Sequence, residues 1–106
     1  MKKILNYIHG KLVEPRSNLF LDNYNPATGK VYSLITDSGS EDVEMAATSA
    51  LKAFPEGSVK TKQKRSDILL KISNLIEKNL DSLAKAESED NGKPVWLAKK
   101  VDIPRA

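Results

Sequence analysis

The strongest constraint on the fold of this chain is a set of apolar residues with helical spacing in its second half. These residues recur with the period of one helix face and are Ile68, Leu69, Ile72, Leu75, Ile76 and Leu80. Residues at this spacing point to one side of an α-helix, whereas a half-buried strand would alternate polar and apolar residues. The pattern predicts an amphipathic helix that starts near Thr61 and needs another surface to cover its apolar side.

A second helix is predicted upstream, between Ser38 and Phe54. Ser38 and Glu41 have the spacing of a capping box, in which the serine caps the helix and the glutamate reaches back. The apolar residues that follow share one face and are Val43, Ala46, Ala47, Ala50, Leu51 and Phe54. Pro55 and Gly57 are predicted to end this helix.

Two shorter helices are predicted after residue 80. The first carries Leu83, Ala84 and Ala86, and Asn91-Gly92 closes it, because both residues accept a left-handed conformation. Pro94 suits the first turn of the next helix. This last helix holds the apolar residues Val95, Trp96, Leu97, Ala98 and Val101. These side chains need a covering surface, so we expect a truncated product or a missing partner segment.

The first third of the chain is predicted to form strands. Residues 6–8 and 11–13 flank His9-Gly10, which suits a tight hairpin turn with positive φ. Residues 19–22 and 31–35 flank a second turn, Asn25-Pro26-Ala27-Thr28-Gly29. The expected fold is therefore α+β, with antiparallel strands within residues 1–36 and three to four helices within residues 37–106.

The composition excludes several functional classes. Hydrophobic residues make up 40% and charged residues 29% of the 106 residues, as in ordinary globular domains. The chain has no cysteine, which excludes disulfides, thiolate metal sites and a cysteine nucleophile within it. No long apolar segment follows Met1, so we expect a cytoplasmic protein without a signal peptide or membrane helix.

The net charge of +3 is weak support for a nucleic-acid partner. Basic residues are spread along the chain except for the run Lys60, Lys62, Lys64 and Arg65. The six aromatic residues do not interleave with that run, as a base-stacking surface would need. We therefore expect no nucleic acid, and the run is interpreted as the solvated start of a helix.

Five stretches in this order resemble the aldehyde dehydrogenase superfamily of NAD(P)-dependent enzymes. They are residues 7–11, 25–31, 41–55, 65–69 and 83–94, and they extend over almost the whole chain. No single stretch is specific for the family, because a turn such as Asn-Pro-Ala-Thr-Gly alone is common. The five stretches in this order are specific. Two positions depart from the family pattern, since His9 replaces the usual Asn or Asp and Gly57 replaces the usual Trp.

The resemblance implies a part of the coenzyme-binding domain, an α/β Rossmann-like domain in the parent enzyme. That enzyme would oxidise an aldehyde to a carboxylic acid with NAD or NADP, and would be a homo-oligomer. In the family, the catalytic cysteine, the general-base glutamate, the oxyanion-holding asparagine and the Gly-rich cofactor segment all lie further along. We therefore expect no catalytic or cofactor-binding residue here, no cofactor on this fragment and no activity without the remainder of the chain.

The last six residues, Val101-Asp102-Ile103-Pro104-Arg105-Ala106, are similar to the branch that oxidises 2-hydroxymuconic and 2-aminomuconic semialdehydes. These substrates carry a carboxylate, which an arginine binds with two parallel hydrogen bonds. In the family the corresponding helix lines the substrate entrance. Arg105 is therefore the candidate substrate-binding residue, with a solvated basic residue as the alternative.

Asp90 is the candidate for a metal site. It lies near the end of a predicted helix, where outward-facing carbonyls and a carboxylate suit a hard cation with oxygen ligands. The resemblance implies a monovalent cation held by Asp90 and the backbone oxygens of Asn23 and Tyr24. The alternative is that Asp90 only contributes to the helix cap.

Three other features have simpler interpretations. His9 has no catalytic partner in sequence and is interpreted as a turn residue. Glu87, Glu89 and Asp90 lack a histidine or cysteine neighbour and are interpreted as a solvated face. Lys93 resembles a phosphate-binding lysine, but no glycine-rich segment precedes it, so we reject a phosphate site.

Two other functions remain open. The chain could be a non-catalytic interaction or complementation module that binds full-length or C-terminal aldehyde dehydrogenase chains through exposed apolar helix faces. It could also be an independent helical domain that folds alone.

Overall fold

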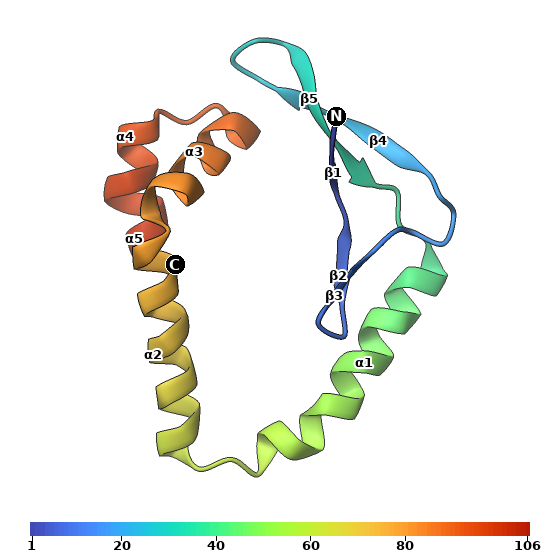
Figure 1. Cartoon of the computed structure of the whole chain (residues 1–106), viewed down its shortest axis with the longest axis vertical. Coiled ribbons are helices and arrows are strands. Elements are labelled where there is room, and N and C mark those ends of the chain that lie inside the picture. The colour runs from blue at the N-terminus through green and yellow to red at the C-terminus, as the bar shows by residue number, and fades with distance from the viewer. The chain divides into compact units, whose positions relative to one another are not determined.

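The computed structural model describes all residues from 1 to 106, which form two compact units. The first unit contains Met1–Tyr24 and Val31–Val59, and the second contains Asn25–Lys30 and Lys60–Ala106. Strands are confined to the first 36 residues and helices begin at Ser40, so the predicted α+β class is confirmed (Figure 1). No helix is long and apolar enough to cross a lipid bilayer.

A three-stranded sheet is the main strand layer of the first unit. Its middle strand, β5 (Lys30–Thr36), lies between β1 (Lys2–Ile4) and β4 (Phe20–Asn25). β1 runs parallel to β5, with Lys2 opposite Ser33. Sequence analysis did not predict β1, because its three residues show neither alternation nor a turn signal.

The hairpin of β2 (Asn6–Ile8) and β3 (Lys11–Val13) has the predicted boundaries and pairs antiparallel. The two turn residues both have positive φ, 53° at His9 and 73° at Gly10. Two successive positive φ values match the twist of the flanking strands, which is why a glycine is favoured there. The predicted role of His9 as a turn residue is confirmed.

The turn between β4 and β5 is also formed as predicted. The Asn25 carbonyl accepts the N–H groups of Thr28 at 3.2 Å and Gly29 at 2.8 Å, and its side-chain oxygen accepts that of Ala27 at 2.9 Å. Gly29 has a φ of 65°, which other residues rarely adopt. A turn this short joins strands that run antiparallel.

The start of α1 (Ser40–Ser58) differs from the prediction. The N-cap is Gly39 instead of Ser38, and Asp42 instead of Glu41 reaches back, with its Oδ2 atom 3.0 Å from the Gly39 nitrogen. The Ser38 hydroxyl instead accepts a 2.9 Å hydrogen bond from the Asn6 side chain. The cap is therefore shifted by one residue from the predicted position.

The end of α1 also differs, because the helix continues through Pro55 to Ser58. Proline has a helix-compatible φ, and its cost inside a helix is a lost N–H bond and a clash with the carbonyl four residues earlier. Here only the last turn is affected. The Ser58 hydroxyl donates a 3.0 Å hydrogen bond to the Pro55 carbonyl, which stabilises that turn.

Two helices of the second unit follow the prediction. α2 (Lys62–Lys78) starts after Thr61, whose hydroxyl oxygen accepts the N–H of Lys64 at 3.2 Å. α3 (Leu80–Asn91) ends at Gly92, which has the predicted left-handed conformation with a φ of 80°. The Gly92 N–H donates to the Ser88 carbonyl at 2.9 Å.

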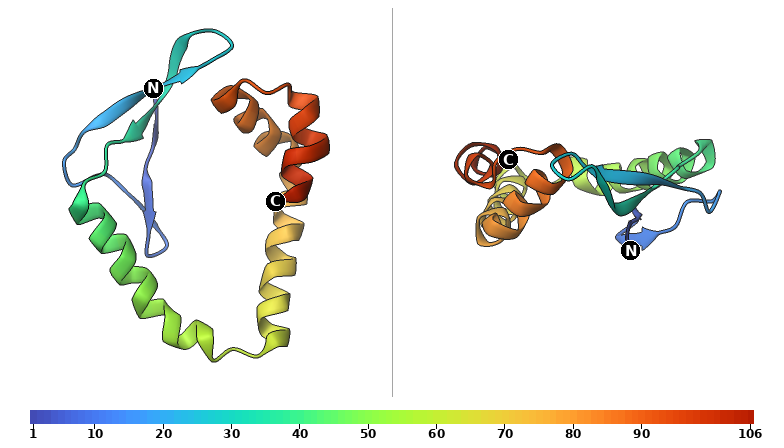
Figure 2. Two further views of the ribbon diagram at one scale, coloured as in Figure 1. Left: turned by 180° about the vertical axis from the view of Figure 1, so that it is seen from behind. Right: turned by 90° about the horizontal axis from the view of Figure 1, so that it is seen from above.

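The last three elements, α4 (Val95–Leu97), η1 (Ala98–Asp102) and α5 (Ile103–Arg105), form one continuous helix (Figure 2). Pro94 caps this helix in an extended conformation, so it precedes the first turn instead of occupying it. η1 is a π-helical turn, in which the Ile103 N–H donates to the Ala98 carbonyl. Pro104 accounts for it, because a proline ring clashes with the carbonyl four residues earlier in regular α-helix.

The apolar faces of α1 and α2 are largely exposed in this chain. Leu51 and Phe54 on α1 have 74% and 67% of their surface accessible, and Leu69 on α2 has 66%. The buried hydrophobic residues are two alanines, Ala84 and Ala98, and neither has accessible surface. The helical periodicity was predicted correctly, but most of these apolar side chains are not buried.

Candidate functional site

The candidate site is built in the second unit, where α3 packs against η1. Ala84 on α3 and Ala98 at the start of η1 are both fully buried. Small side chains allow two helices to approach closely, so these alanines fix the position of η1 on α3. The residues that precede and follow this contact carry the charged groups of the site.

The turn after α3 is held by hydrogen bonds and by close packing against Pro26. A Cβ atom at Gly92 would lie only 3.0 Å from Pro26 Cγ. The Asn91 side chain accepts the N–H of Lys93 at 2.9 Å and donates to Glu87 at 2.6 Å. The left-handed glycine and these hydrogen bonds together fix the direction of the backbone at Lys93.

Lys93 forms an ion pair with Asp102 in η1. The distance between Lys93 Nζ and Asp102 Oδ2 is 2.8 Å, and the side chains are 39% and 25% exposed. This hydrogen bond raises the pKa of Lys93 above its ordinary value, with a smaller contribution from the negative charge of Glu87, while partial desolvation opposes the shift. The pair joins the α3–α4 turn to the π-helical turn.

Arg105 lies at the end of α5, three residues after Asp102, and is exposed. It takes part in none of the three ion pairs, which are Lys3–Glu14, Lys93–Asp102 and Lys99–Asp81. A guanidinium without an internal carboxylate partner can form two parallel hydrogen bonds with a carboxylate from outside. The geometry is thus compatible with the predicted substrate-binding role, which remains a prediction.

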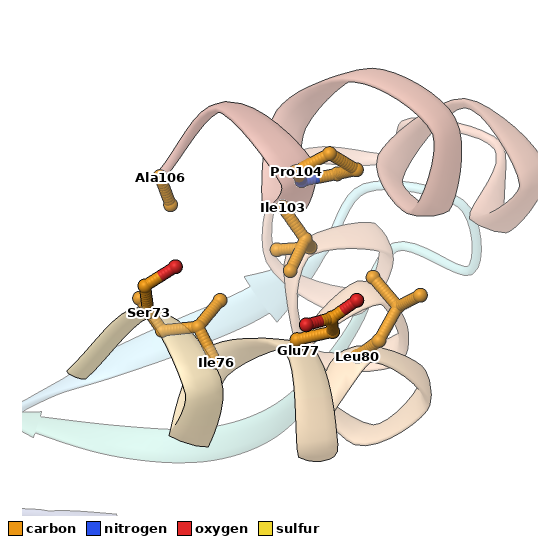
Figure 3. A pocket seen from close by; sticks show the side chains of 7 residues that line it. All are labelled: Ser73, Ile76, Glu77, Leu80, Ile103, Pro104 and Ala106. Carbon is orange, nitrogen blue, oxygen red and sulfur yellow. The ribbon is translucent and has the colours of Figure 1, made fainter. Parts of the chain in front are cut away.

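A cavity of about 290 Å³ lies beside α5 (Figure 3). Its walls come from α2, the start of α3 and the end of the chain, and the lining residues are Ser73, Ile76, Glu77, Leu80, Ile103, Pro104 and Ala106. Glu77 places a carboxylate among mainly apolar groups, which disfavours a negatively charged ligand. Arg105 is not a lining residue, so this cavity is not the expected site for a substrate carboxylate.

The three predicted cation ligands belong to different units. Asn23 and Tyr24 are neighbours on β4 in the first unit, whereas Asp90 is an exposed residue in the last turn of α3 in the second. The Asn23 side chain donates hydrogen bonds to Tyr32 at 3.0 Å and to the buried Ser33 at 3.1 Å. No group of three His, Cys, Asp or Glu side chains has a metal-binding arrangement. The cation site therefore remains a prediction.

Sequence analysis missed the pairing of Lys93 with Asp102. The lysine and the aspartate are nine positions apart, which is not a helix-neighbour spacing, so no local pattern predicts the pair. The pair forms because Gly92 and Pro94 turn the chain back on itself. The one available signal was the Asn91-Gly92 cap, which predicts a reversal but not the contact that the reversal creates.

Comparison with known sequences identifies relatives over almost the whole chain. Residues 12–106 match the family model described as "Aldehyde dehydrogenase family". The chain is 45% identical over 101 residues to 2-aminomuconic semialdehyde dehydrogenase of Bos taurus and 43% identical to a long-chain-aldehyde dehydrogenase of Acinetobacter. The alignments cover 95% of this chain, which spans about a fifth (20%) of the length of these relatives.

Comparison with solved structures gives the same result. The crystal structure of PnpE in complex with nicotinamide adenine dinucleotide matches 99% of this chain and 21% of its own, with a TM-score of 0.92 and 31% identity. The NAD⁺ complex of aldehyde dehydrogenase from Bacillus cereus matches 96% of this chain and 21% of its own, with a TM-score of 0.90 and 33% identity. With this fold and the family match over residues 12–106, the chain belongs to the aldehyde dehydrogenase family.

Proposed function

We propose that this chain forms the first part of the coenzyme-binding domain of an enzyme that oxidises an aldehyde to a carboxylic acid. The observation that carries the proposal is the match of almost the whole chain to about a fifth of aldehyde dehydrogenases from animals and bacteria. NAD or NADP is the proposed hydride acceptor, and the NAD complexes among the structural relatives support this choice. The proposed location is the cytoplasm.

The proposed substrate is an aldehyde that also carries a carboxylate, such as a muconic semialdehyde. The 2-aminomuconic semialdehyde dehydrogenases of Bos taurus, Danio rerio, Mus musculus and Homo sapiens are 41–46% identical to this chain. Arg105, exposed and outside the ion pairs of the chain, is the proposed ligand of that carboxylate. It would orient the substrate and would take no part in bond breaking.

The groups that carry out the oxidation are proposed to lie outside these residues. In this family a thiolate attacks the aldehyde carbon, and this chain contains no cysteine. Residues 1–106 alone are therefore proposed to be inactive. Their contribution would be structural support and substrate orientation, with a monovalent cation bound by Asp90 and the backbone oxygens of Asn23 and Tyr24.

The proposed partner is the remainder of an aldehyde dehydrogenase chain, in an enzyme that is a homo-oligomer. The exposed apolar residues of α1 and α2 support this, because uncovered apolar faces of this extent are uncommon on independent domains. The same observation supports a second candidate function, a non-catalytic module that complements a separate C-terminal chain. Both functions place the same helix faces against the same kind of surface.

The test compares residues 1–106 with the intact protein that contains them. The intact protein should form NADH or NADPH with a carboxylated aldehyde, and residues 1–106 alone should not. Addition of a separately produced C-terminal part should restore activity if the chain is a complementation module. An intact protein without dehydrogenase activity, or turnover by residues 1–106 alone, would contradict the proposal.

A further inference from the structure

We propose that Lys93 is a positioning residue for substrate selectivity, because it holds the Asp102 carboxylate away from Arg105. This inference rests on the proposed role of Arg105 in binding a substrate carboxylate. Lys93 itself would not contact the substrate. Its pairing with Asp102 would explain why Arg105, three positions from that aspartate, remains available to a substrate carboxylate. Three steps carry it.

The first step is the spacing of Asp102 and Arg105. They are three positions apart, and the backbone from Asp102 to Ile103 is right-handed helical, with φ and ψ of −69° and −52° at Asp102 and −67° and −42° at Ile103. Side chains three residues apart on a helix are neighbours, and an aspartate followed by an arginine at this spacing commonly forms an ion pair. Asp102 is thus the nearest competitor for the guanidinium along the chain.

The second step is that Asp102 is already paired. Its Oδ2 atom is 2.8 Å from Lys93 Nζ, and its side chain is only 25% exposed, so solvent screens this pair less than a fully exposed one. The ion pair with Asp102 is not the only contact that holds Lys93 in place. The left-handed Gly92, packed against Pro26, and the hydrogen bond from the Lys93 nitrogen to Asn91 already fix the start of its side chain.

The third step is the local count of charges. Lys99, the other lysine of this segment with a partner, is bound to Asp81 at 2.8 Å, and Glu87 accepts a hydrogen bond from Asn91. Glu77 is in the wall of the cavity beside α5. Lys93 is therefore the cation paired with Asp102, and its loss would remove the one ion pair of this carboxylate.

The experiment measures KM in the intact enzyme with 6-oxohexanoate, a carboxylated aldehyde, and hexanal, an uncharged aldehyde of the same length. Lys93→Met should raise the ratio of KM for 6-oxohexanoate to KM for hexanal by about twofold or more, the effect expected for a helix ion pair at this spacing. Lys93→Arg should retain the wild-type ratio. Lys99→Met is the matched control, because it removes an ion pair of equal length from the same segment and should not change the ratio.

A double-mutant cycle separates this role from a structural one. Once Arg105→Ala has removed the guanidinium, the additional change Lys93→Met should have no further effect on the KM ratio. Asp102→Asn combined with Lys93→Met should return the ratio to the wild-type value or below it. Melting temperatures of all variants report any general loss of stability.

The outcomes distinguish the inference from the proposed function. No turnover of 6-oxohexanoate by the wild-type enzyme, or an equal effect of Arg105→Ala on both aldehydes, contradicts the substrate assignment on which the inference depends. An Arg105-dependent KM with no effect of Lys93→Met contradicts the inference alone. So does an effect of Lys93→Met that persists in the Arg105→Ala background.

Discussion

Pro26 and Gly92 are in close contact, so that a Cβ atom at position 92 would lie 3.0 Å from Cγ and 3.6 Å from Cβ of the proline. The turn between β4 and β5 thereby supports the cap of α3, although the two are 66 positions apart in the sequence. From the sequence, Pro26 was interpreted as part of a turn and Gly92 as the end of a helix. The structure shows that they are one packing contact.

The first prediction concerns this contact. Gly92→Ala should destabilise the protein by about 1–3 kcal/mol, because alanine is strained at a φ of 80° and its methyl group would collide with Pro26. Gly57→Ala is the control, since a Cβ there has no neighbour within 4 Å and alanine is the better helix former. Urea unfolding followed by circular dichroism should show opposite signs. Equal effects of the two substitutions would refute the role given to Pro26.

The second prediction concerns Asp42, which is only 4% exposed. Its two carboxylate oxygens accept the N–H groups of Arg16 and Gly39, each at 3.0 Å. Asp42→Ala should cost about 2–4 kcal/mol of unfolding free energy, because two backbone donors lose a charged acceptor. Glu41→Ala, one residue earlier and exposed, should change stability by less than about 0.5 kcal/mol. A similar loss in both variants would restore the sequence-based assignment of Glu41 as the capping residue.

The third prediction concerns the exposed apolar face of α1. Phe54→Ser should reduce self-association of residues 1–106, because the ring is 67% exposed, and light scattering after size-exclusion chromatography measures this. In the intact enzyme the same substitution should lower the melting temperature, since the proposed remainder of the chain covers the ring. Lys52→Ser, in an exposed position on the same helix, should do neither. A Phe54→Ser enzyme with unchanged melting temperature would show that this face stays uncovered.

The fourth prediction concerns Arg105. Arg105→Ala should raise KM for 6-oxohexanoate by roughly tenfold or more, the size of a lost charge-assisted hydrogen bond, and change KM for hexanal much less. Arg105→Lys should have an intermediate effect, because lysine keeps the charge but not the two parallel donors. Steady-state kinetics with both aldehydes measure this. An equal rise in KM for both aldehydes would contradict the substrate-binding role of Arg105.

Local signals in the sequence were sufficient for the turns. His9-Gly10, Asn25 with Gly29, and Thr61 act through their own backbone or through residues two to four positions away. The structure shows all three as predicted. The signals that predict these features therefore lie within a few residues of them.

Features that depend on distant residues were not predictable in this way. Gly39 instead of Ser38 caps α1, and the Ser38 hydroxyl is hydrogen-bonded to Asn6, which is far away in the sequence. The π-helical turn is explained by the nearby Pro104, but the burial of its first residue, Ala98, comes from the packing of η1 against α3, which the sequence does not show. Arg105 was found by resemblance alone, and the Lys93–Asp102 pair was found only in the structure.

The parallel pairing of β1 with β5 has a consequence for biosynthesis. Residues 2–4 are synthesised before the strand that they pair with, because Lys2 lies opposite Ser33, which is made about thirty residues later. The β2–β3 hairpin has both of its strands within residues 6–13 and needs no such delay. Since contacts of low sequence separation form faster, the hairpin should fold during translation while the first strand waits unpaired. β1 is thus made early and becomes ordered only after β5 has been synthesised.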